Sequence, residues 1–311
     1  MGLTQLQSFI ATKFDRRHAL LTSSGSFALI AALNASQAPK GSSVIMPASC
    51  CPIVLFAIQM AGYNVILADV SLCSLSMEVN NIEAVFNDSV SVIVAVHGYG
   101  HYCKIDEIAS FAKQHNVTLI EDACLAYGST YKGKPLGSFG DLSILSFGYD
   151  KPIDNQYGGA VLTNSERLFE CAKGFLNDNK MAQFSGSKQL EILNDRFLNL
   201  NKQMQVRKKN VVYLQKKIIN SLFVKASFDA DVTYWRYPLL IKNRTHFLAK
   251  AKENGITFTK HYKSLGELQT NGHYPNASLI DEQIINLFVR PETPQEQLTN
   301  MVMFINDYQD K

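Results

Sequence analysis

Short apolar segments alternate with amphipathic segments over the first half of the chain. The apolar segments have the length of strands, and the amphipathic segments carry apolar residues at the i, i+3 and i+4 spacing of helices. This alternation is typical of a parallel sheet that is covered by helices. The predicted strands are 18–22, 43–46, 64–68, 90–96, 117–121, 143–147 and 159–163, and the predicted helices between them are 26–35, 50–61, 80–86 and 104–115.

The pattern changes after residue 164. Residues 166–176 and 188–222 have helical periodicity, and the second segment is long enough to contain an interruption. The rest predicts a strand at 233–241, a helix at 245–254, a short strand at 256–259 and a last helix at 294–308, in which Thr293 would be the N-cap and Pro294 the first helical residue. We therefore predict a large α/β domain (1–176), a helical connector (177–230) and a small C-terminal α+β domain (231–311).

Composition narrows the classes of protein to consider. The chain has 311 residues, 46% of them hydrophobic and 18% charged, which is typical of a globular protein. A formal net charge of +3 is too small to indicate nucleic acid or an anionic membrane as a partner. The apolar stretch 44–63 contains Pro47, Pro52 and Gln59, so we predict buried core there and not a membrane span. The first 21 residues lack the pattern of a secretory signal, and we expect a cytoplasmic protein.

The cysteines and histidines indicate neither a disulfide scaffold nor a metal centre. The six cysteines form no CxxC pair, and we expect them to be reduced. His97, His101 and Cys103 come closest to a metal-binding cluster, but no fourth ligand follows at a recognisable spacing. We therefore predict no metal site.

Two polar features follow predicted strands, at the edge where open parallel sheets bind their ligands. In TSSGSFAL (22–29), a glycine turn with hydroxyls precedes an apolar helix, so Gly25 and Ser26 could bind an anion at the helix N-terminus. A serine that only caps the helix fits this segment equally well. The strand at 117–121 ends at Glu121, and Asp122 after it could hold a protonated pyridine nitrogen or only cap the next turn.

The third feature is a lysine on a polar loop between two predicted strands. Lys151 precedes Pro152, which favours an extended backbone at the lysine, and Ser146 precedes Lys151 by five residues. An anion site, a carboxylate and an amine are what pyridoxal phosphate requires for its phosphate, its ring nitrogen and a Schiff base. The three features together predict a pyridoxal phosphate site.

The sequence resembles the DegT/DnrJ/StrS-type sugar aminotransferases, which are pyridoxal phosphate enzymes of the type I fold. The family segments SGTAAL, VHLYG and EDAAQAHGATYKGRKVGSLGD are similar to SGSFAL at 24–29, VHGYG at 96–100 and EDACLAYGSTYKGKPLGSFGD at 121–141. The family's SF-x-x-x-K with a following GGA is similar to SFGYDK at 146–151 with GGA at 158–160. HYPPLH and FPNAE resemble HYKSL at 261–265 and YPNA at 274–277.

The resemblance implies an α/β fold of the type I aminotransferase kind, with a mostly parallel sheet, helices on both faces and a smaller C-terminal α+β domain. It implies transfer of an amino group from an amino acid such as glutamate to a keto-sugar, expected to be nucleotide-linked, by a homodimer. The resemblance implies that Lys151 and Asp122 are catalytic, the lysine through a Schiff base and the carboxylate by accepting a hydrogen bond from the protonated pyridine nitrogen. Gly25, Ser26 and Ser146 would contact the phosphate.

Several positions depart from the family pattern. Leu125 replaces a Gln or His that often bonds the ring oxygen. Cys51 stands where an aromatic residue commonly stacks on the ring, and we expect its thiol to contact the cofactor with a reduced stacking area. Counterparts of the usual N-terminal segment and of the GYNYRMS element after residue 176 are missing. The departures leave two alternatives, namely a family member that binds cofactor or a partner without turnover, and another pyridoxal phosphate reaction such as sugar dehydration. In related dehydratases a histidine typically replaces the lysine, so Lys151 favours the aminotransferase.

Overall fold

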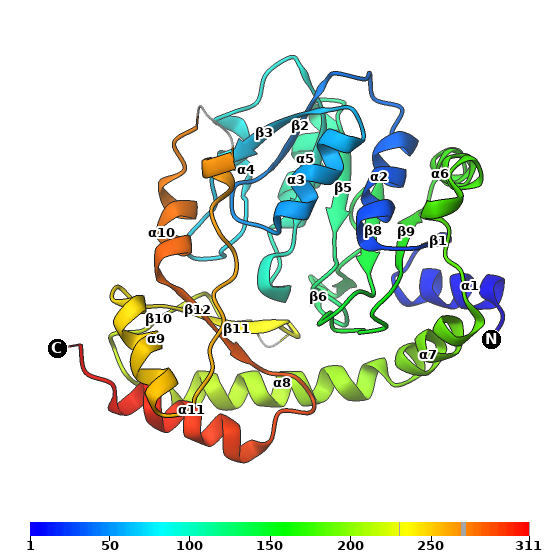
Figure 1. Ribbon diagram of the computed structural model, residues 1–311. Helices are drawn as coiled ribbons and strands as arrows, with labels where there is room; N and C mark the ends of the chain where they lie inside the picture. The colour runs from blue at the N-terminus through cyan, green and yellow to red at the C-terminus, as the bar shows by residue number, and fades with distance from the viewer. Residues whose placement is uncertain (230, 269–271, 311) are drawn as a thin grey trace.

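A seven-stranded sheet forms the centre of the protein. The computed structural model describes residues 1–229, 231–268 and 272–310. The strands lie in the order β1-β9-β8-β5-β4-β2-β3 (Figure 1). Their bounds are β1 (His18–Thr22), β2 (Ser43–Pro47), β3 (Asn64–Ala68), β4 (Val90–Val96), β5 (Thr118–Asp122), β8 (Leu142–Ser146) and β9 (Gly159–Thr163). All seven predicted strands are confirmed to within one residue at each end.

The sheet is mostly parallel, as predicted, with one exception. β9 lies between β1 and β8 and runs antiparallel to both of them. The other neighbours in the sheet pair in parallel. Because β8 and β9 are antiparallel neighbours, the segment that joins them, residues 147–158, stays at one edge of the sheet and contains Lys151.

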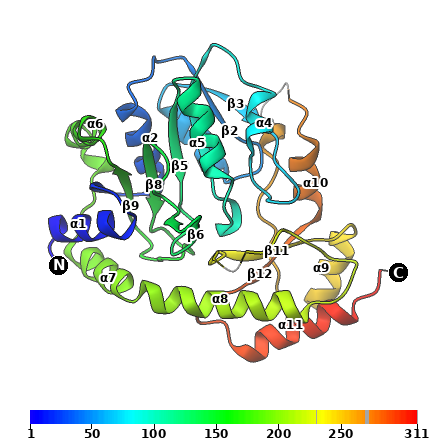
Figure 2. The ribbon, with the colours of Figure 1, turned by 180° about the vertical axis from the view of Figure 1, so that it is seen from behind.

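Helices cover both faces of the sheet, which confirms the predicted layers (Figures 1 and 2). One hydrophobic cluster joins the sheet to α2, α3 and α6, and a second cluster joins the opposite face to α1, α5 and α7. Along β2 the residues alternate between these clusters, since Val44 and Met46 face the first and Ile45 faces the second. The helices are α1 (Leu3–Lys13), α2 (Gly25–Ala35), α3 (Pro52–Met60), α4 (Val79–Glu83), α5 (Ile105–Gln114), α6 (Glu166–Asp178) and α7 (Ser187–Leu198).

The C-terminal part contains a three-stranded antiparallel sheet of order β10-β11-β12 that packs on helices. The long helical segment is interrupted at Asn199, where α7 ends and α8 begins, and α8 lies along the lower side in both ribbon views. The further elements are α8 (Leu200–Lys217), β10 (Val224–Lys225), β11 (Arg236–Leu240), α9 (Arg244–Glu253), α10 (Pro275–Gln283), β12 (Ile284–Phe288) and α11 (Gln295–Asp307). The domain boundaries at 176 and 230 stay a prediction.

Three details of the C-terminal prediction were wrong. Residues 256–259 form no strand, and only Thr259 makes an isolated bridge, to Asn286. β12, which pairs with β11 on the side opposite to β10, was not predicted, because it follows α10 directly and so lacks the turn signal that would have marked it. Pro294 is the N-cap of α11 itself, with an extended ψ of 146°, and the helix begins at Gln295.

A buried carboxylate holds together the loops at the carboxyl end of β5. Glu121, at the end of β5, is fully buried and accepts hydrogen bonds from the backbone N–H groups of Gly137 (2.6 Å), Phe139 (2.8 Å) and Gly140 (3.0 Å). The Ser143 hydroxyl donates to the same carboxylate at 3.3 Å, and the fully buried ring of His97 lies beside it, with 2.9 Å between Nε2 and Oε1. These bonds fix the turn that leads into β8.

His97 and Glu121 form a charged pair inside the protein. Burial alone would lower the pKa of His97, but contacts with Cys103 and Glu121 outweigh it and raise the pKa to about 10. Burial alone would raise the pKa of Glu121, but the His97 contact, the Gly137 N–H and the charge of Arg16 lower it to about 2. The pair is therefore ionised at neutral pH.

The pH dependence of stability tests this pair. The pKa of His97 rises on folding from 6.5 to about 10, so its contribution is complete below pH 6.5 and is lost as the pH rises through 10. The pKa of Glu121 falls from 4.5 to about 2, so its contribution is present above pH 4.5 and is lost as the pH falls through 2. We expect Glu121→Gln to lower the free energy of unfolding by about 3–5 kcal/mol near neutral pH, because it leaves His97 unpaired.

Urea unfolding at about pH 6 and about pH 9 measures the stability lost in Glu121→Gln and the pH-dependent contribution of His97. The wild-type protein should lose more stability between these two values than Glu121→Gln does, since the variant no longer holds the raised pKa of His97. Glu107→Gln, at an exposed position on α5, is the matched control. If the stability of Glu121→Gln and of Glu107→Gln depended equally on pH, His97 and Glu121 would not form the charged pair described above.

Candidate functional site

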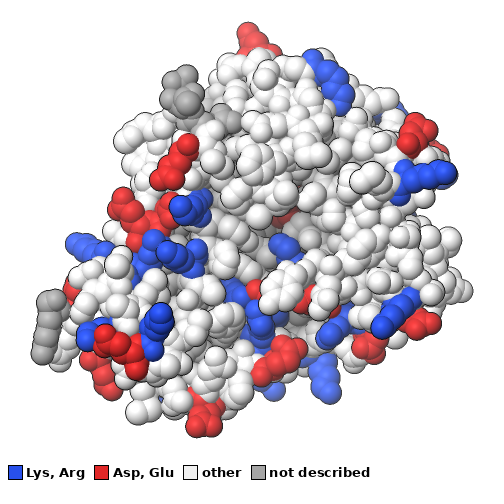
Figure 3. Space-filling view, viewed as in Figure 1, with Lys and Arg blue, Asp and Glu red and all other residues white. Residues whose placement is uncertain are grey.

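A cavity of about 270 Å³ lies at the carboxyl ends of the parallel strands. It is enclosed by the N-terminal turns of α2 and α3, the ends of β5 and β8, and the loop 147–158. Figure 3 shows a hollow in the middle of this face of the molecule, with charged side chains inside it and at its edge. All six residues predicted for the cofactor line the cavity, namely Gly25, Ser26, Cys51, Asp122, Ser146 and Lys151.

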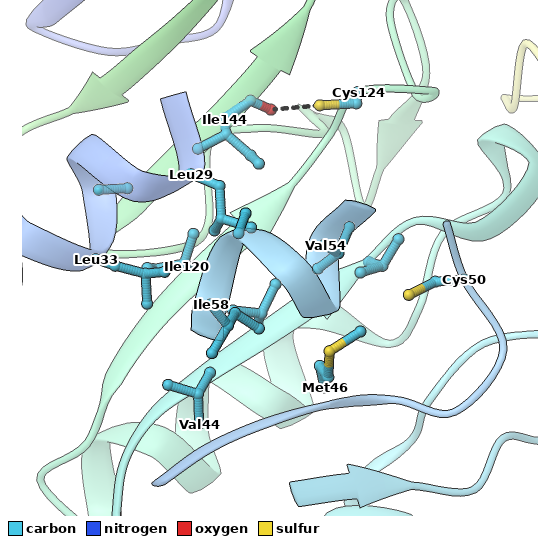
Figure 4. Packing of buried hydrophobic residues seen from close by; sticks show 14 of the residues in the cluster. Leu29, Leu33, Val44, Met46, Cys50, Val54, Ile58, Ile120, Cys124 and Ile144 are labelled. Carbon is cyan, nitrogen blue, oxygen red and sulfur yellow. Dashed lines mark hydrogen bonds between the residues drawn. The ribbon is translucent and has the colours of Figure 1, made fainter. Parts of the chain in front are cut away.

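The floor of the cavity is apolar. Leu29, Val54, Cys124 and Ile144 line it and also belong to the hydrophobic cluster between the sheet, α2 and α3. Figure 4 shows these four side chains converging from different elements, with the Cys124 thiol donating to the carbonyl of Ile144. A flat aromatic molecule would therefore rest on packed side chains rather than on water.

The N-terminus of α2 supplies the polar end of the cavity. Ser24 is the N-cap, and its hydroxyl accepts a hydrogen bond from the N–H of Phe27 at 3.2 Å. The first intrahelical bond runs from Ala28 to the Ser24 carbonyl, so the N–H groups of Gly25 and Ser26 precede it. The two interpretations of this segment are thus compatible, because Ser24 caps the helix while the next two N–H groups lie at the cavity wall.

Glycine at position 25 permits a close contact between α2 and β8. A Cβ atom there would lie 2.6 Å from the Cβ of Ser146 and 2.9 Å from its Oγ. Behind it, a Cβ on Gly159 would lie 2.6 Å from the backbone carbonyl of Ser24. Tyr127, which the sequence did not single out, fixes Ser146 from the other side by donating to its carbonyl (2.7 Å) and accepting from its N–H (2.9 Å).

Asp122 is only 6% exposed and lies on the wall of the cavity. Its Oδ1 accepts the N–H of Cys124 at 3.0 Å, so the carboxylate does cap the following turn, as the simpler interpretation predicted. The same bond fixes the orientation of the carboxylate. Leu125, by contrast, is buried away from this cavity, and Cys124 lines it instead.

The loop of Lys151 is held from the C-terminal part of the chain. The carboxylate of Asp150 forms ion pairs with both Arg236 and Arg290, and its carbonyl accepts the indole N–H of Trp235 at 2.5 Å. Asp150 has a positive φ of 60°, so this loop is strained at the residue next to the lysine. No carboxylate of the described residues forms an ion pair with Lys151 itself.

We call these four residues the Asp150 clamp (Asp150, Trp235, Arg236 and Arg290), and no sequence pattern predicted it. Arg236 is 2% exposed, and its guanidinium lies 3.9 Å from the ring centroid of Phe288 and 4.8 Å from that of Trp235. An arginine in an apolar strand carries no local pattern that points to a partner in another part of the chain.

The two histidines of the possible metal cluster have other partners. His97 faces Glu121 through Nε2, and the sulfur of Cys103 lies 3.4 Å from its Nδ1. Nδ1 of His101 lies 2.9 Å from the carbonyl of Tyr102. Among the described residues, no group of three or more His, Cys, Asp or Glu side chains is arranged to hold a metal ion. Nor does any described helix combine the length and apolarity that a membrane crossing requires.

Comparison with known proteins identifies relatives over nearly the whole chain. The model of the DegT/DnrJ/EryC1/StrS aminotransferase family matches residues 3–306. The GDP-perosamine synthase of Escherichia coli O157:H7 is 30% identical over 324 aligned residues, covering 95% of this chain and 87% of that protein. The family resemblance drawn from the motifs is thereby confirmed.

Solved structures share the fold at lower sequence identity. A DegT DnrJ EryC1 StrS aminotransferase from Brucella abortus has a TM-score of 0.90 at 19% identity, covering 97% of this chain and 88% of that one. The Bacillus subtilis protein ntda, solved with bound cofactor PMP, has a TM-score of 0.88 at 20% identity, covering 97% of this chain and 76% of that one. These likenesses confirm the predicted type I fold.

A side chain at position 25 would disturb the cavity. Because the added Cβ atom would overlap Ser146, we expect Gly25→Ala to lower the free energy of unfolding by about 1–3 kcal/mol. Gly174→Ala is the control, since a Cβ at this exposed helical position would meet nothing within 4 Å. The control should leave stability unchanged or raise it by about 0.5–1 kcal/mol in urea unfolding. Equal stability of the two variants would contradict the close contact.

Proposed function

Since this chain belongs to the DegT/DnrJ/EryC1/StrS aminotransferase family, we propose that it transfers an amino group from an amino acid such as glutamate to a nucleotide-linked keto-sugar, using pyridoxal 5′-phosphate. One observation carries the proposal, namely that a single cavity brings together Lys151, Asp122 and the Gly25–Ser26 turn. The relative's name, GDP-perosamine synthase, supports a nucleotide-linked sugar as the acceptor.

The residues present fit the cofactor. The free N–H groups of Gly25 and Ser26, with the hydroxyl of Ser146, would hold the phosphate at the positive end of the α2 dipole. A Cβ atom at position 25 would overlap Ser146, one of the residues that would hold the phosphate, which explains the glycine. Cys51 would lie against the ring in place of an aromatic side chain, where its smaller surface gives less stacking.

The bound cofactor would supply an electron sink for the bond changes at the amino group's carbon. Asp122 would keep the ring nitrogen protonated, through a carboxylate that the Cys124 N–H orients. The Nζ atom of Lys151 would attach the cofactor and, once released, carry the proton between the two carbons that exchange it. The apolar floor at Leu29, Val54 and Ile144 would exclude water from these steps.

The alternatives have less support. Leu125, Cys51 and the missing middle element motivated the non-catalytic interpretation. Leu125 does not line the cavity, whereas Cys51 does, and Lys151 and Asp122 line it as well. A dehydratase is disfavoured because a lysine occupies the position where related dehydratases typically carry histidine. We therefore retain amino transfer as the proposed reaction.

Covalent trapping tests the attachment. Added pyridoxal 5′-phosphate should colour the wild-type protein, and borohydride reduction should fix the cofactor's mass on the peptide that contains Lys151. Lys151→Ala should show neither effect, whereas Lys134→Ala, which removes an exposed lysine, should behave as wild type. An adduct on any other lysine, or none, would refute the assignment. Glutamate with a panel of nucleotide-linked keto-sugars then tests the reaction.

We also propose that the protein is a homodimer and that α3 lies in the interface. Ile53, Phe56 and Met60 on this helix are 49%, 46% and 75% exposed, and they form an apolar face that begins beside Cys51. Ile53 also lines the cavity, so a partner subunit on α3 would extend the cavity wall.

The mass in solution tests the dimer. We expect light scattering to give twice the chain mass of 34.7 kDa. Phe56→Glu should shift the protein toward the monomer, because it places a charge in the apolar face. Leu222→Glu changes a comparably exposed residue, 42% exposed, outside α3 and should leave the dimer intact. A wild-type monomer would overturn this proposal.

A further inference from the structure

A second cavity, of about 300 Å³, adjoins the first. Lys151 and Gln156 line both of them, so the lysine loop is the wall that the two cavities share. The opposite walls of the second cavity come from α7, α8 and the segment after β12, which contribute Arg196, Arg207 and Arg290. A ligand in the second cavity would therefore lie beside the same lysine as a ligand in the first.

Positive charge exceeds negative charge around this second cavity. The carboxylate of Asp150 already forms the two ion pairs of the Asp150 clamp. The carboxylate of Asp154 accepts hydrogen bonds from the backbone N–H groups of Asp150 and Gln156, each at 2.9 Å. Glu292 is the remaining carboxylate in the lining. Within the part of the chain that the structure describes, neither Arg196 nor Arg207 forms an ion pair.

Arg207 has an unsatisfied donor. It is only 4% exposed, and its Nη1 donates to the carbonyl of Trp235 at 3.2 Å, but its buried Nε has no partner among the described residues. Burial lowers its pKa to about 10, and the nearby charges of Arg236 and Arg290 add to this, while Glu292 opposes it. A buried guanidinium without a carboxylate is unfavourable unless an anion joins it.

We infer that the second cavity binds an oxyanion group of a substrate through Arg196, Arg207 and Arg290. Guanidinium groups hold carboxylates and phosphates through paired N–H donors, and several of them around one enclosed space favour such a ligand. The inference rests on the proposed function, which offers two sources of this chemistry. One source is a carboxylate of the amino donor, and the other is the diphosphate of the nucleotide-linked sugar.

Binding to the full-length protein, measured by calorimetry without added cofactor, tests the inference and separates the sources. The probes are 2-oxoglutarate for the carboxylate, and guanosine and uridine diphosphate for the diphosphate. We expect one class of probe to bind, and Arg196→Gln to weaken that binding about tenfold or more, since a charge-assisted hydrogen bond is lost. Arg196→Lys should recover part of the affinity.

The controls keep the test independent of folding and of the proposed reaction. Arg17→Gln removes an exposed arginine that does not line the cavity, and this variant should bind the probes as wild type does. Arg196 is half-buried, so its substitution disturbs the fold less than that of the buried Arg207. Thermal melts of each variant should show a folded protein. Equal binding by Arg196→Gln and Arg17→Gln, or no binding of either probe class to wild type, would overturn the inference.

Borohydride trapping at Lys151 distinguishes this failure from failure of the proposed function. If the wild type and Arg196→Gln both give the adduct but show no arginine-dependent probe binding, only the second-cavity inference fails. If the wild type gives no adduct, the proposed function fails, while the binding measurement stands by itself because it uses neither cofactor nor turnover.

Discussion

The polar end of the cavity depends on two backbone segments that meet at residue 25 with no side chain between them. The first turn of α2 lies against the end of β8, and the start of β9 packs behind the same turn, so that Ser24, Ser146 and Gly159 are neighbours. This contact requires β9 to lie between β1 and β8, since only a strand in that position brings Gly159 beside Ser24. The antiparallel strand thus forms part of the site, although it contributes little chemistry of its own. Position 25 must be glycine because Ser146 leaves no room for a Cβ atom. The positive N-terminal end of α2 therefore stays open to a ligand.

The adjacent carboxylates Glu121 and Asp122 on β5 have different surroundings, because successive side chains of a strand point to opposite faces of the sheet. Glu121 points to the face covered by α1 and α5, where His97 and three backbone N–H groups hold it in a closed polar network. Asp122 points to the face covered by α2 and α3, where the cavity lies. The first carboxylate fixes the end of the strand and the turn before β8, and so it fixes the wall on which the second one sits. A one-residue shift in the register of β5 would exchange the two and bury the wrong charge.

Much of the fold could be predicted from local pattern, because each strand of the large sheet is a short apolar segment between breaks. The direction of β9 could not be predicted this way, since periodicity does not encode which neighbour a strand pairs with. β12 was missed because it continues from α10 without a turn residue. The six predicted site residues line one cavity because the strand ends of a parallel sheet lie side by side, and their roles stay a prediction. Tyr127, Arg207 and Arg236 were missed because their partners lie far away in sequence, as in the 86-residue separation of Arg236 and Asp150.

The Asp150 clamp also has a consequence for the order in which the protein is completed during synthesis. Every segment of the contact at Gly25 has been synthesised once β9 is made, so the pocket for an anion can form on the emerging chain. The Asp150 carboxylate, however, has no basic partner until Arg236 and then Arg290 have left the ribosome. The lysine loop is therefore fixed only after nearly the whole chain exists. A chain that ended before Arg290 would contain the sheet and the Gly25 turn but would lack one of the two ion pairs that hold Asp150, the residue before the lysine.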